Sequence, residues 1–453
     1  MRAELAFAAG QCELLRHLGH ALRRSATANA ACSIKVSTEQ REAQAEMAQT
    51  SKRMLEGYRV LDFTQVLAGP TTTRYMAEMG AEVVKVEFAP RGDISRAVPY
   101  VRDGRSGYYV QQNRGKRSLC LDLKHPAAAA IVRELIPKFD VMVENYAPGV
   151  IGRLGFGYEA VRALHPKIVM CSISTFGQEG PLANRPGYDF IGCAYSGVLS
   201  MIGERDGAPS LPQVGVGDIT TGVHALSAIT AALLHRERTG EGQYVETSLL
   251  DCYFSYNDLT VHAASLSGGT ILPRRNGAHH FAMAPLGVFK GKRNPILIMA
   301  ATEHQFGYLC RAMGRPELPS DPRFCNNTQR MANVEELKRL IQDWFDAMPT
   351  DDDAYRLFNE HRVPYAQVLS IEEAMAHPHL REREVVRTIN DRYLGEFDVP
   401  GFPMRFSGYE RHPEMQAPTL GEHNAPVLHE YLGYSADRIA ALEREGVLLR
   451  GER

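Results

Sequence analysis

The sequence lacks closely spaced cysteines, although it contains eight cysteines in 453 residues. No CxxC pair occurs. Disulfide frameworks belong to small secreted domains, and structural zinc sites need ligands close together in the chain. The cysteines therefore predict reduced thiols in an intracellular compartment, and we expect neither a disulfide scaffold nor a bound metal.

An excess of one charge and long apolar runs are also lacking. Lys plus Arg (51) nearly balance Asp plus Glu (53), which leaves a formal net charge of −2. Without a basic tract we expect no nucleic-acid partner, and an anionic substrate must be held by a local cluster of charges. Apolar runs such as residues 225–234 are too short to cross a bilayer, so we expect no membrane partner.

The first 54 residues differ from the rest because they are rich in Ala, Gln, Ser and Thr and show no strand pattern. Residues 14–24 could form a basic amphipathic helix, which is typical of transit peptides, but Glu4 and Glu13 are unusual in such peptides. We expect a disordered extension or an over-long start, with a mitochondrial presequence as the alternative. The expected location is the cytoplasm, or the mitochondrial matrix in a eukaryote.

From Tyr58 onward, short apolar segments alternate with helical patterns. We predict strands at 58–63, 81–88, 119–123, 141–146, 168–175 and 243–248, and helices at 71–79, 127–139, 158–164, 218–235 and 249–266. This alternation is typical of an α/β fold with a mostly parallel sheet covered on both faces. Ligands of such sheets bind beyond the carboxyl ends of the strands. The corresponding loops are 64–70, 87–96, 145–153 and 175–181, and none of them follows the GxGxxG pattern of dinucleotide sites.

The pattern changes after Gly268 and Gly269. Residues 283–290 and 295–301 predict an antiparallel pair, followed by helices at 303–313, 334–347 and 352–361, and residues 420–449 predict a turn and one more helix. We therefore predict a large α/β domain over 55–250, a linker over 251–275, a small α+β domain over 276–375, and a linker with a C-terminal return to the large domain over 376–453.

Two carboxylates, Asp189 and Asp218, each follow a glycine-containing turn and precede helical sequence. An Asp in this place is most often an N-cap, and that interpretation stays open for both residues. A carboxylate at a strand-to-helix turn can also attack an acyl group. For Asp218, backbone N–H groups at the helix N-terminus would favour the ionised form and could polarise a thioester carbonyl.

A series of short motifs extends along the chain in one order. They are residues 60–70 (VLDFTQVLAGP), 80–87 (GAEVVKVE), 91–93 (RGD), 113–118 (NRGKRS), 144–149 (ENYAPG), 187–189 (GYD), 217–218 (GD), 238–243 (RTGEGQ) and 420–423 (LGEH). In this order and spacing they resemble the class III CoA-transferases, the group of formyl-CoA transferase, CaiB and BaiF. The resemblance covers about residues 55–450.

The resemblance implies a Rossmann-like large domain, a small domain and an interlocked homodimer. It implies that Asp218 attacks a donor acyl-CoA to form a mixed anhydride, that CoA then forms a thioester with Asp218, and that an acceptor carboxylate collects the CoA. No permanently bound cofactor is implied, because coenzyme A enters as a thioester substrate. We expect succinyl-CoA as the donor and a dicarboxylate as the acceptor.

The resemblance also implies further site residues. Asp189 and Tyr188 would act beside the nucleophile; Tyr108, His280 and Leu67 would contact the substrates; and Gln65, Val66, Arg91, Lys116, Asn145, Tyr146 and Arg153 would contact CoA. The planar fork of an arginine suits a phosphate group. A solvated surface role stays open for Arg91 and Lys116, packing at a turn for Tyr108, and a structural role for His280.

Two differences from formyl-CoA transferase narrow the range of substrates that we expect. Leu67 stands where that enzyme has a glutamine, and the path from Leu266 to Pro285 is too short for its glycine-rich insertion. Both argue against oxalate and formyl-CoA. Racemases of the same fold need a histidine where this chain has Tyr188, and a phenol with a reference pKa near 10 is a poor replacement. Racemase-type proton transfer and CoA binding without turnover stay open as alternatives.

Overall fold

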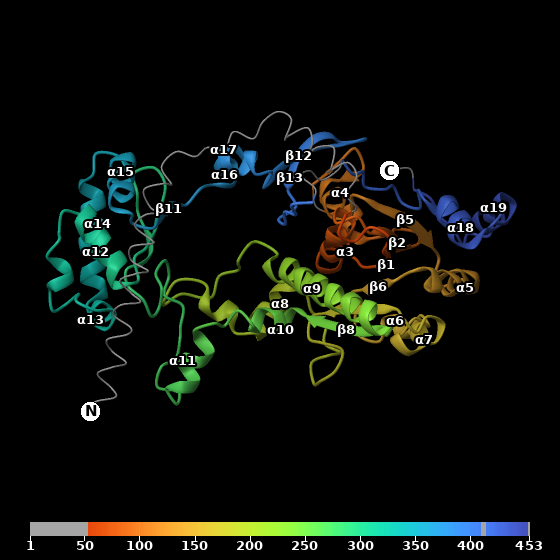
Figure 1. Cartoon of the computed structure of the whole chain (residues 1–453), viewed down its shortest axis with the longest axis horizontal. Helices are drawn as coiled ribbons and strands as arrows, with labels where there is room; N and C mark the ends of the chain where they lie inside the picture. The colour runs from red at the N-terminus through yellow and green to blue at the C-terminus, as the bar shows by residue number, and fades with distance from the viewer. Residues whose placement is uncertain (1–52, 99, 409–413, 452–453) are drawn as a thin grey trace, which may run out of the picture. The chain divides into compact units, whose positions relative to one another are not determined.

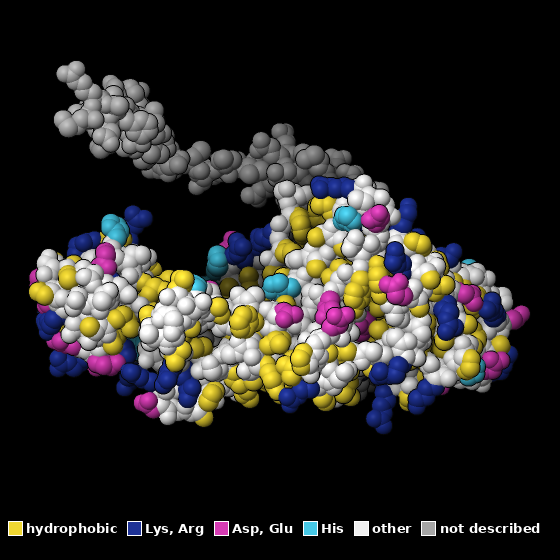
Figure 2. Space-filling view, turned by 90° about the horizontal axis from the view of Figure 1, so that it is seen from below, with side chains coloured by type: hydrophobic (Ala, Val, Ile, Leu, Met, Phe, Trp, Pro, Cys, Tyr) yellow, Lys and Arg dark blue, Asp and Glu magenta, His cyan; other side chains and the backbone are white. Residues whose placement is uncertain are grey.

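The computed structural model describes residues 53–98, 100–408 and 414–451. The expectations for the first 54 residues concern a segment that lies almost wholly outside this range. On the face drawn in Figure 2, acidic and basic side chains are interspersed with apolar ones, and no broad patch of one charge covers the described residues there. This distribution agrees with the near balance of charges in the sequence.

A six-stranded sheet organises the N-terminal half of the described chain (Figure 1). Its strands are β1 (Arg59–Phe63), β2 (Glu82–Phe88), β5 (Lys116–Leu121), β6 (Val141–Glu144), β7 (Val169–Ser174) and β8 (Gln243–Ser248). All neighbouring strands are parallel. β6 and β7 are buried at every position, and β1, β2 and β5 at all but one or two, as a sheet covered on both faces requires. The predicted α/β class with a parallel sheet is confirmed.

The strand order is β5-β2-β1-β6-β7-β8. From β1 the chain moves outward through β2 to β5, and then continues on the other side of β1 with β6, β7 and β8. This is the order of a doubly wound sheet, in which the loops that follow the two central strands diverge and leave a crevice for a ligand. The crevice therefore lies beyond the carboxyl ends of β1 and β6.

The helices of this half connect the strands. They are α3 (Ala68–Glu78), α4 (Gly107–Asn113), α5 (Pro126–Leu135), α6 (Val150–Arg153), α7 (Tyr158–Leu164), α8 (Asp189–Tyr195), α9 (Val216–Thr239), α10 (Leu249–Phe254) and α11 (Thr260–Leu266). Helix α3 begins earlier than predicted because Pro70 is accommodated in its first turn. The single helix predicted over 249–266 is wrong. It is broken after α10, where the side chain of Asn257 donates to the carbonyl groups of Phe254 and Ser196.

Helix α9 is longer than predicted and ends at Gly240, whose φ of 79° lies in the left-handed region that favours glycine. Among the described helices it is long and apolar enough to span a membrane by length and composition. However, it packs against α3, β7 and β8 and buries Ala225, Ile229 and Leu233. These contacts place one face of α9 in the core.

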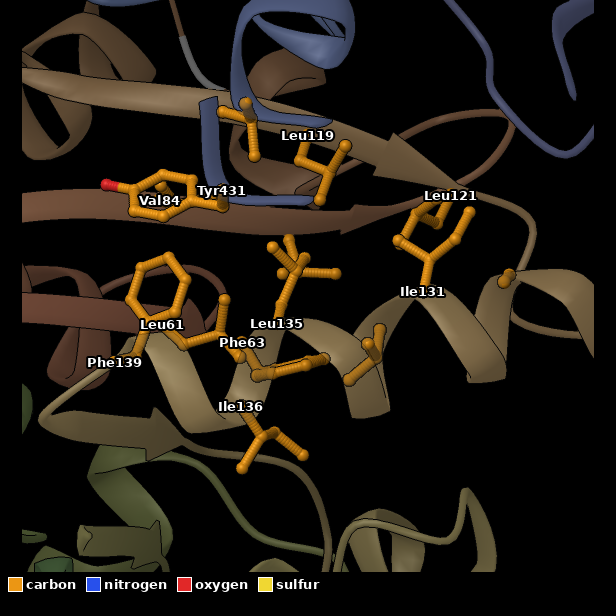
Figure 3. Packing of buried hydrophobic residues seen from close by; sticks show 14 of the residues in the cluster. Leu61, Phe63, Val84, Leu119, Leu121, Ile131, Leu135, Ile136, Phe139 and Tyr431 are labelled. Carbon is orange, nitrogen blue, oxygen red and sulfur yellow. The ribbon is translucent and has the colours of Figure 1, made fainter. Parts of the chain in front are cut away.

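The largest hydrophobic core lies against the sheet and includes the C-terminal helices (Figure 3). Ile131 and Leu135 of α5 pack with Leu61 of β1, and the ring of Tyr431 lies 4.9 Å from that of Phe139. Tyr431 belongs to α18 (Asn424–Leu432), which is followed by α19 (Ala436–Arg444). The prediction of one helix here is wrong, because Gly433 at φ 67° ends α18 and a second helix follows.

A second core lies within residues 284–363. It contains the antiparallel sheet β11-β10-β9, built from β9 (Leu286–Phe289), β10 (Ile296–Met299) and β11 (Tyr365–Gln367), and the helices α12 (Glu303–Ala312), α13 (Asn327–Ala332), α14 (Val334–Ala347) and α15 (Asp351–His361). The predicted antiparallel pair is confirmed, and β11 is an addition. The domain boundaries stay predictions.

The remaining elements are short. They are the ribbon β3 (Val101–Arg102) with β4 (Arg105–Ser106), helices α16 (Ile371–Ala376) and α17 (Pro378–Glu382), the hairpin β12 (Val386–Asp391) with β13 (Gly395–Pro400), and 3-10 turns at Ile94–Ala97, Ile136–Lys138, Val198–Met201 and Leu318–Ser320. The β12–β13 hairpin was not predicted.

Candidate active site

A pocket of about 330 Å³ lies where the strand order reverses. Its lining comes from the segment after β1 (residues 65–68), the loop after β6 (145–148), the end of β7 (173–175) and the segment 183–188, together with Ile94, Asp218 and Leu249. Most of these residues belong to loops that follow parallel strands, which is the expected position of a ligand site in this fold.

The first loop of the pocket is held in a strained conformation. Val66 has a φ of 66°, which is a genuine outlier for a β-branched residue. Its N–H donates to Oδ1 of Asp93 at 3.1 Å. The side-chain amide of Asn145 accepts from the N–H of Gln65 at 2.7 Å and donates to the Gln65 carbonyl at 2.8 Å. Strained backbone held by its surroundings is a recurring feature of functional loops.

Buried charged side chains hold the backbone of this loop. Lys85 donates to the carbonyl of Thr64 at 2.6 Å and pairs with Asp93 at 2.9 Å. Burial alone would raise the pKa of Asp93, but Lys85 and the N–H groups of Ser95 and Val66 lower it to about 2. Asp93 therefore stays ionised at neutral pH and keeps Val66 in place.

Neither Asp189 nor Asp218 caps its own helix, so the capping interpretation is wrong in that form. The N-caps of α8 and α9 are Tyr188 and Gly215, and neither makes a side-chain cap bond. Instead, Asp189 reaches across to α9, where its Oδ2 accepts from the N–H of Asp218 at 3.2 Å. Asp189 is thus buried behind Asp218 and caps the helix that carries it.

Tyr253 of α10 completes this cap. Its hydroxyl accepts from the N–H of Gly217 at 3.0 Å and donates to Oδ1 of Asp189 at 2.5 Å. A Cβ on residue 217 would lie 2.1 Å from a ring carbon of Tyr253 and 2.4 Å from Oδ1 of Asp189. The Gly-Asp motif therefore has a steric cause, because only glycine leaves room for the tyrosine and the carboxylate beside Asp218.

Burial raises the pKa of Asp218 to about 7, and the neighbouring charge of Asp189 acts in the same direction. The expectation that helix N–H groups favour the ionised form of Asp218 is wrong, since those of Gly217 and Asp218 are bonded to Tyr253 and Asp189. Because a carboxylate with a raised pKa is more basic, it is also a stronger nucleophile once ionised.

The structure gathers many of the predicted site residues in this pocket. Its lining includes Gln65, Val66, Leu67, Asn145, Tyr146, Tyr188 and Asp218. Tyr108 is not a lining residue, but burial raises its pKa and the charge of Asp218 raises it further, which indicates that the two residues are close.

Besides Asp189 and Tyr108, four further predicted residues do not line this pocket. Lys116 is buried, and its ammonium group pairs with Asp62 at 3.0 Å and donates to Thr73, Asn113 and Pro70. Its place favours a structural role over contact with a phosphate. Arg91 and Arg153 are exposed, and Arg153 ends α6, just after the loop 145–148. His280 lines a second cavity, of about 270 Å³, together with Arg274.

Sequence reasoning missed two residues of the site. Arg185 is the cation among the described lining residues, and its guanidinium contacts the hydroxyl and the ring of Tyr195. Its position just before Pro186 and the 187–189 motif was an available signal. Tyr253 offered no such signal, because an aromatic residue in a helix is ordinarily a core residue.

The fold and the site together define a doubly wound α/β protein. Its pocket lies where the strand order reverses, and the carboxylate of Asp218 in this pocket has a raised pKa. The model of CoA-transferase family III matches residues 55–424, and the chain belongs to this family. Family membership confirms the predicted class of enzyme, a CoA-transferase.

Three similar proteins illustrate this membership. The chain is 35% identical over 404 residues to the succinyl-CoA:glutarate CoA-transferase of Mus musculus, which covers 89% of this chain and 92% of the mouse protein. It is 36% identical over 385 residues to the acetyl-CoA:oxalate CoA-transferase of Acetobacter aceti, covering 84% and 96% of the two chains. The crystal structure of a CaiB/BaiF family protein from Brucella suis matches with a TM-score of 0.73 at 31% identity, covering 84% of this chain and all of that one.

Proposed function

We propose that this CoA-transferase moves CoA from succinyl-CoA to a dicarboxylate through covalent intermediates on Asp218. One observation carries the proposal. Asp218 lies in the switch-point pocket with a pKa raised to about 7, so that near neutral pH it is a basic carboxylate available for attack.

In the proposed reaction, a carboxylate oxygen of Asp218 attacks the thioester carbon of the donor and expels the CoA thiolate. The thiolate then attacks the Asp218 carbonyl of the resulting anhydride, which releases the donor acid and leaves CoA bound to Asp218 as a thioester. The acceptor carboxylate displaces this thiolate to form a second anhydride. The thiolate finally attacks the acceptor carbonyl, which releases acceptor-CoA and restores Asp218.

Two pocket features support this chemistry. Helix α3 begins at Ala68, which lines the pocket, and the first N–H groups of a helix have no partner within it. These groups take the oxyanion-stabilising role that the bonded N–H groups of Gly217 and Asp218 cannot fill. The planar guanidinium group of Arg185 can donate two parallel hydrogen bonds to a substrate carboxylate.

The substrate choice is supported by the relatives and by the loop. The mouse relative is named for succinyl-CoA and glutarate, and the Acetobacter relative for acetyl-CoA and oxalate, so both names give a dicarboxylate acceptor. Leu67 replaces the glutamine of formyl-CoA transferase and makes this wall apolar. A pocket lined by both this apolar side chain and the cation of Arg185 suits a dicarboxylate with a methylene chain better than oxalate.

We further propose a homodimer, with coenzyme A as the only cofactor-like group, in the cytoplasm or the mitochondrial matrix. Large apolar side chains are exposed along consecutive helices, among them Val216, Val223 and Leu234 of α9, Phe254 of α10 and Val261 of α11. Exposed apolar surface of this kind marks association sites. Light scattering of the purified protein tests the dimer, and a monomeric mass would refute it.

The covalent step is tested by trapping. The protein is incubated with succinyl-CoA, quenched with hydroxylamine, digested and analysed by mass spectrometry. We expect a hydroxamate on Asp218, and none in the Asp218→Asn variant. Transfer to a dicarboxylate without any modified Asp218 peptide would overturn the proposal. In a parallel incubation with an α-methylacyl-CoA in deuterated water, uptake of deuterium into the acyl group would indicate the racemase reaction instead.

A further inference from the structure

Tyr253 is a buried residue that does not line the pocket, yet its hydroxyl connects the first turn of α9 with Asp189 of α8. The hydroxyl accepts a hydrogen bond from the N–H of Gly217 and donates one to Oδ1 of Asp189. Asp189 in turn accepts from the N–H of Asp218. The first turn of α9 is therefore tied to α8 and α10 through one phenol and one carboxylate.

We infer that Tyr253 is a positioning residue of the transfer reaction, which acts through Asp189 to hold the Asp218 carboxylate against the pocket. The inference rests on the proposed function, because it assigns Asp218 as the group that must be held. It adds a residue that touches neither substrate nor the reacting atoms.

The contacts explain why this hydroxyl matters for geometry. Without it, the buried N–H of Gly217 loses its acceptor and Asp189 loses one of its two donors. Both losses loosen the first turn of α9, where Asp218 is the third helical residue. Displacement of a reacting group by about 1 Å can reduce a rate by about 100-fold.

The surroundings of the ring make the hydroxyl a separable part of the residue. Tyr253 is 1% exposed, its ring packs edge-on against Tyr256, and it fills the space that glycine leaves at position 217. Phenylalanine preserves this packing and removes only the oxygen. Tyr253→Phe therefore tests the hydroxyl bonds with little change of volume.

Tyr434→Phe is a matched control. Tyr434 is also buried, and its hydroxyl donates to the carboxylate of Glu134 at 3.0 Å, but it packs in the core formed with the C-terminal helices and does not line the pocket. We expect Tyr253→Phe to lower kcat by about 10-fold or more with KM for succinyl-CoA within about 2-fold of wild type. We expect Tyr434→Phe to leave both constants within about 2-fold.

A double-mutant cycle separates positioning from general destabilisation. If Tyr253 acts through Asp189, then Tyr253→Phe combined with Asp189→Asn should be no slower than Asp189→Asn alone, because groups that act as a unit are non-additive. Additive losses in kcat, or a Tyr253→Phe kcat within 2-fold of wild type, would overturn the inference. If Tyr253→Phe does not fold by circular dichroism, Asp189→Asn takes its place, and a wild-type kcat for that variant overturns it.

The inference and the proposed function fail in different ways. An Asp218→Asn variant that still transfers CoA removes the proposed function, whatever Tyr253 does. An inactive Asp218→Asn variant beside a fully active Tyr253→Phe variant leaves Asp218 as nucleophile and removes only the role of Tyr253.

Discussion

Replacement of Asp218 by Asn should abolish transfer and at the same time stabilise the protein above neutral pH. The fold raises the pKa of Asp218 from 3.8 to about 7 through burial and the charge of Asp189. Ionising Asp218 therefore costs free energy in the folded state that is absent in the unfolded chain. Asn has nearly the same shape and never ionises, so the cost disappears.

The size of the gain follows from the shift. A difference of about 3 units (7 − 3.8), at 1.36 kcal/mol per unit, gives a ceiling of about 4 kcal/mol. The Asp218 residue is partly exposed to solvent, and water screens the charge of such a group. We therefore expect a gain in the free energy of unfolding of about 1–2 kcal/mol at about pH 8.

Because the pKa of Asp218 is raised in the folded state, the gain in stability from Asp218→Asn depends on pH. At about pH 8 the folded wild type bears the full cost. The cost shrinks as pH falls below about 7 and disappears only below about pH 4, where the carboxyl of the unfolded chain is protonated as well. Urea unfolding of both proteins across this range measures the difference. Asp251→Asn is the matched control, because Asp251 is an exposed residue in the first turn of α10, where a negative charge is favourable, so this change should not stabilise. A gain for Asp218→Asn that is absent, or equal at all pH values, would refute the reasoning.

Three further outcomes are expected. The kcat/KM for succinyl-CoA should rise about 10-fold per pH unit below about pH 7 and level off above it, as Asp218 ionises; a flat profile from stopped assays would contradict the nucleophile assignment. Arg185→Gln should raise KM for the dicarboxylate by about 10-fold or more with kcat little changed, since it removes the fork that suits a carboxylate, and an unchanged KM in an acceptor titration would exclude it from the acceptor site. Gly217→Ala should lower the free energy of unfolding by about 1–3 kcal/mol and reduce kcat, because the new methyl group overlaps Tyr253 and Asp189; wild-type values in urea unfolding and initial-rate assays would count against the packing described.

Much of the fold was predictable because local signals agreed with it. The bounds of α7 (Tyr158–Leu164) and α14 (Val334–Ala347) match the prediction, since apolar periodicity and helix-ending residues coincide there. The hairpin β12–β13 was missed for a physical reason. Most of its side chains are polar or exposed, and only Ile389, Asp391 and Val399 are buried, so the apolar alternation that indicates a strand is weak.

The site was predictable only where a single motif carries the chemistry. Asp218 and Tyr188 stand in motifs, and both line the pocket. The bond between Tyr253 and Asp189 joins residues 64 positions apart, which no local pattern reports. Lys116 shows the converse, because a lysine in a short strand suggests solvent contact, whereas folding places it against Asp62 in the interior.

The crossing of α3 and α9 has a consequence for how substrates enter. At Gly222 of α9 a Cβ would lie 2.5 Å from the carbonyl oxygen of Ala68, and Thr72 donates to the Gly222 carbonyl at 2.9 Å. The helix that begins at the strained loop and the helix that carries Asp218 are therefore closely packed and hydrogen-bonded, and we expect them to move together as one wall. Asn145 ties the loop 145–148 to the same wall through its two bonds to Gln65. Admission of the long CoA arm and departure of the product should then depend on residues 183–188, where we expect bound acyl-CoA to slow amide hydrogen exchange most.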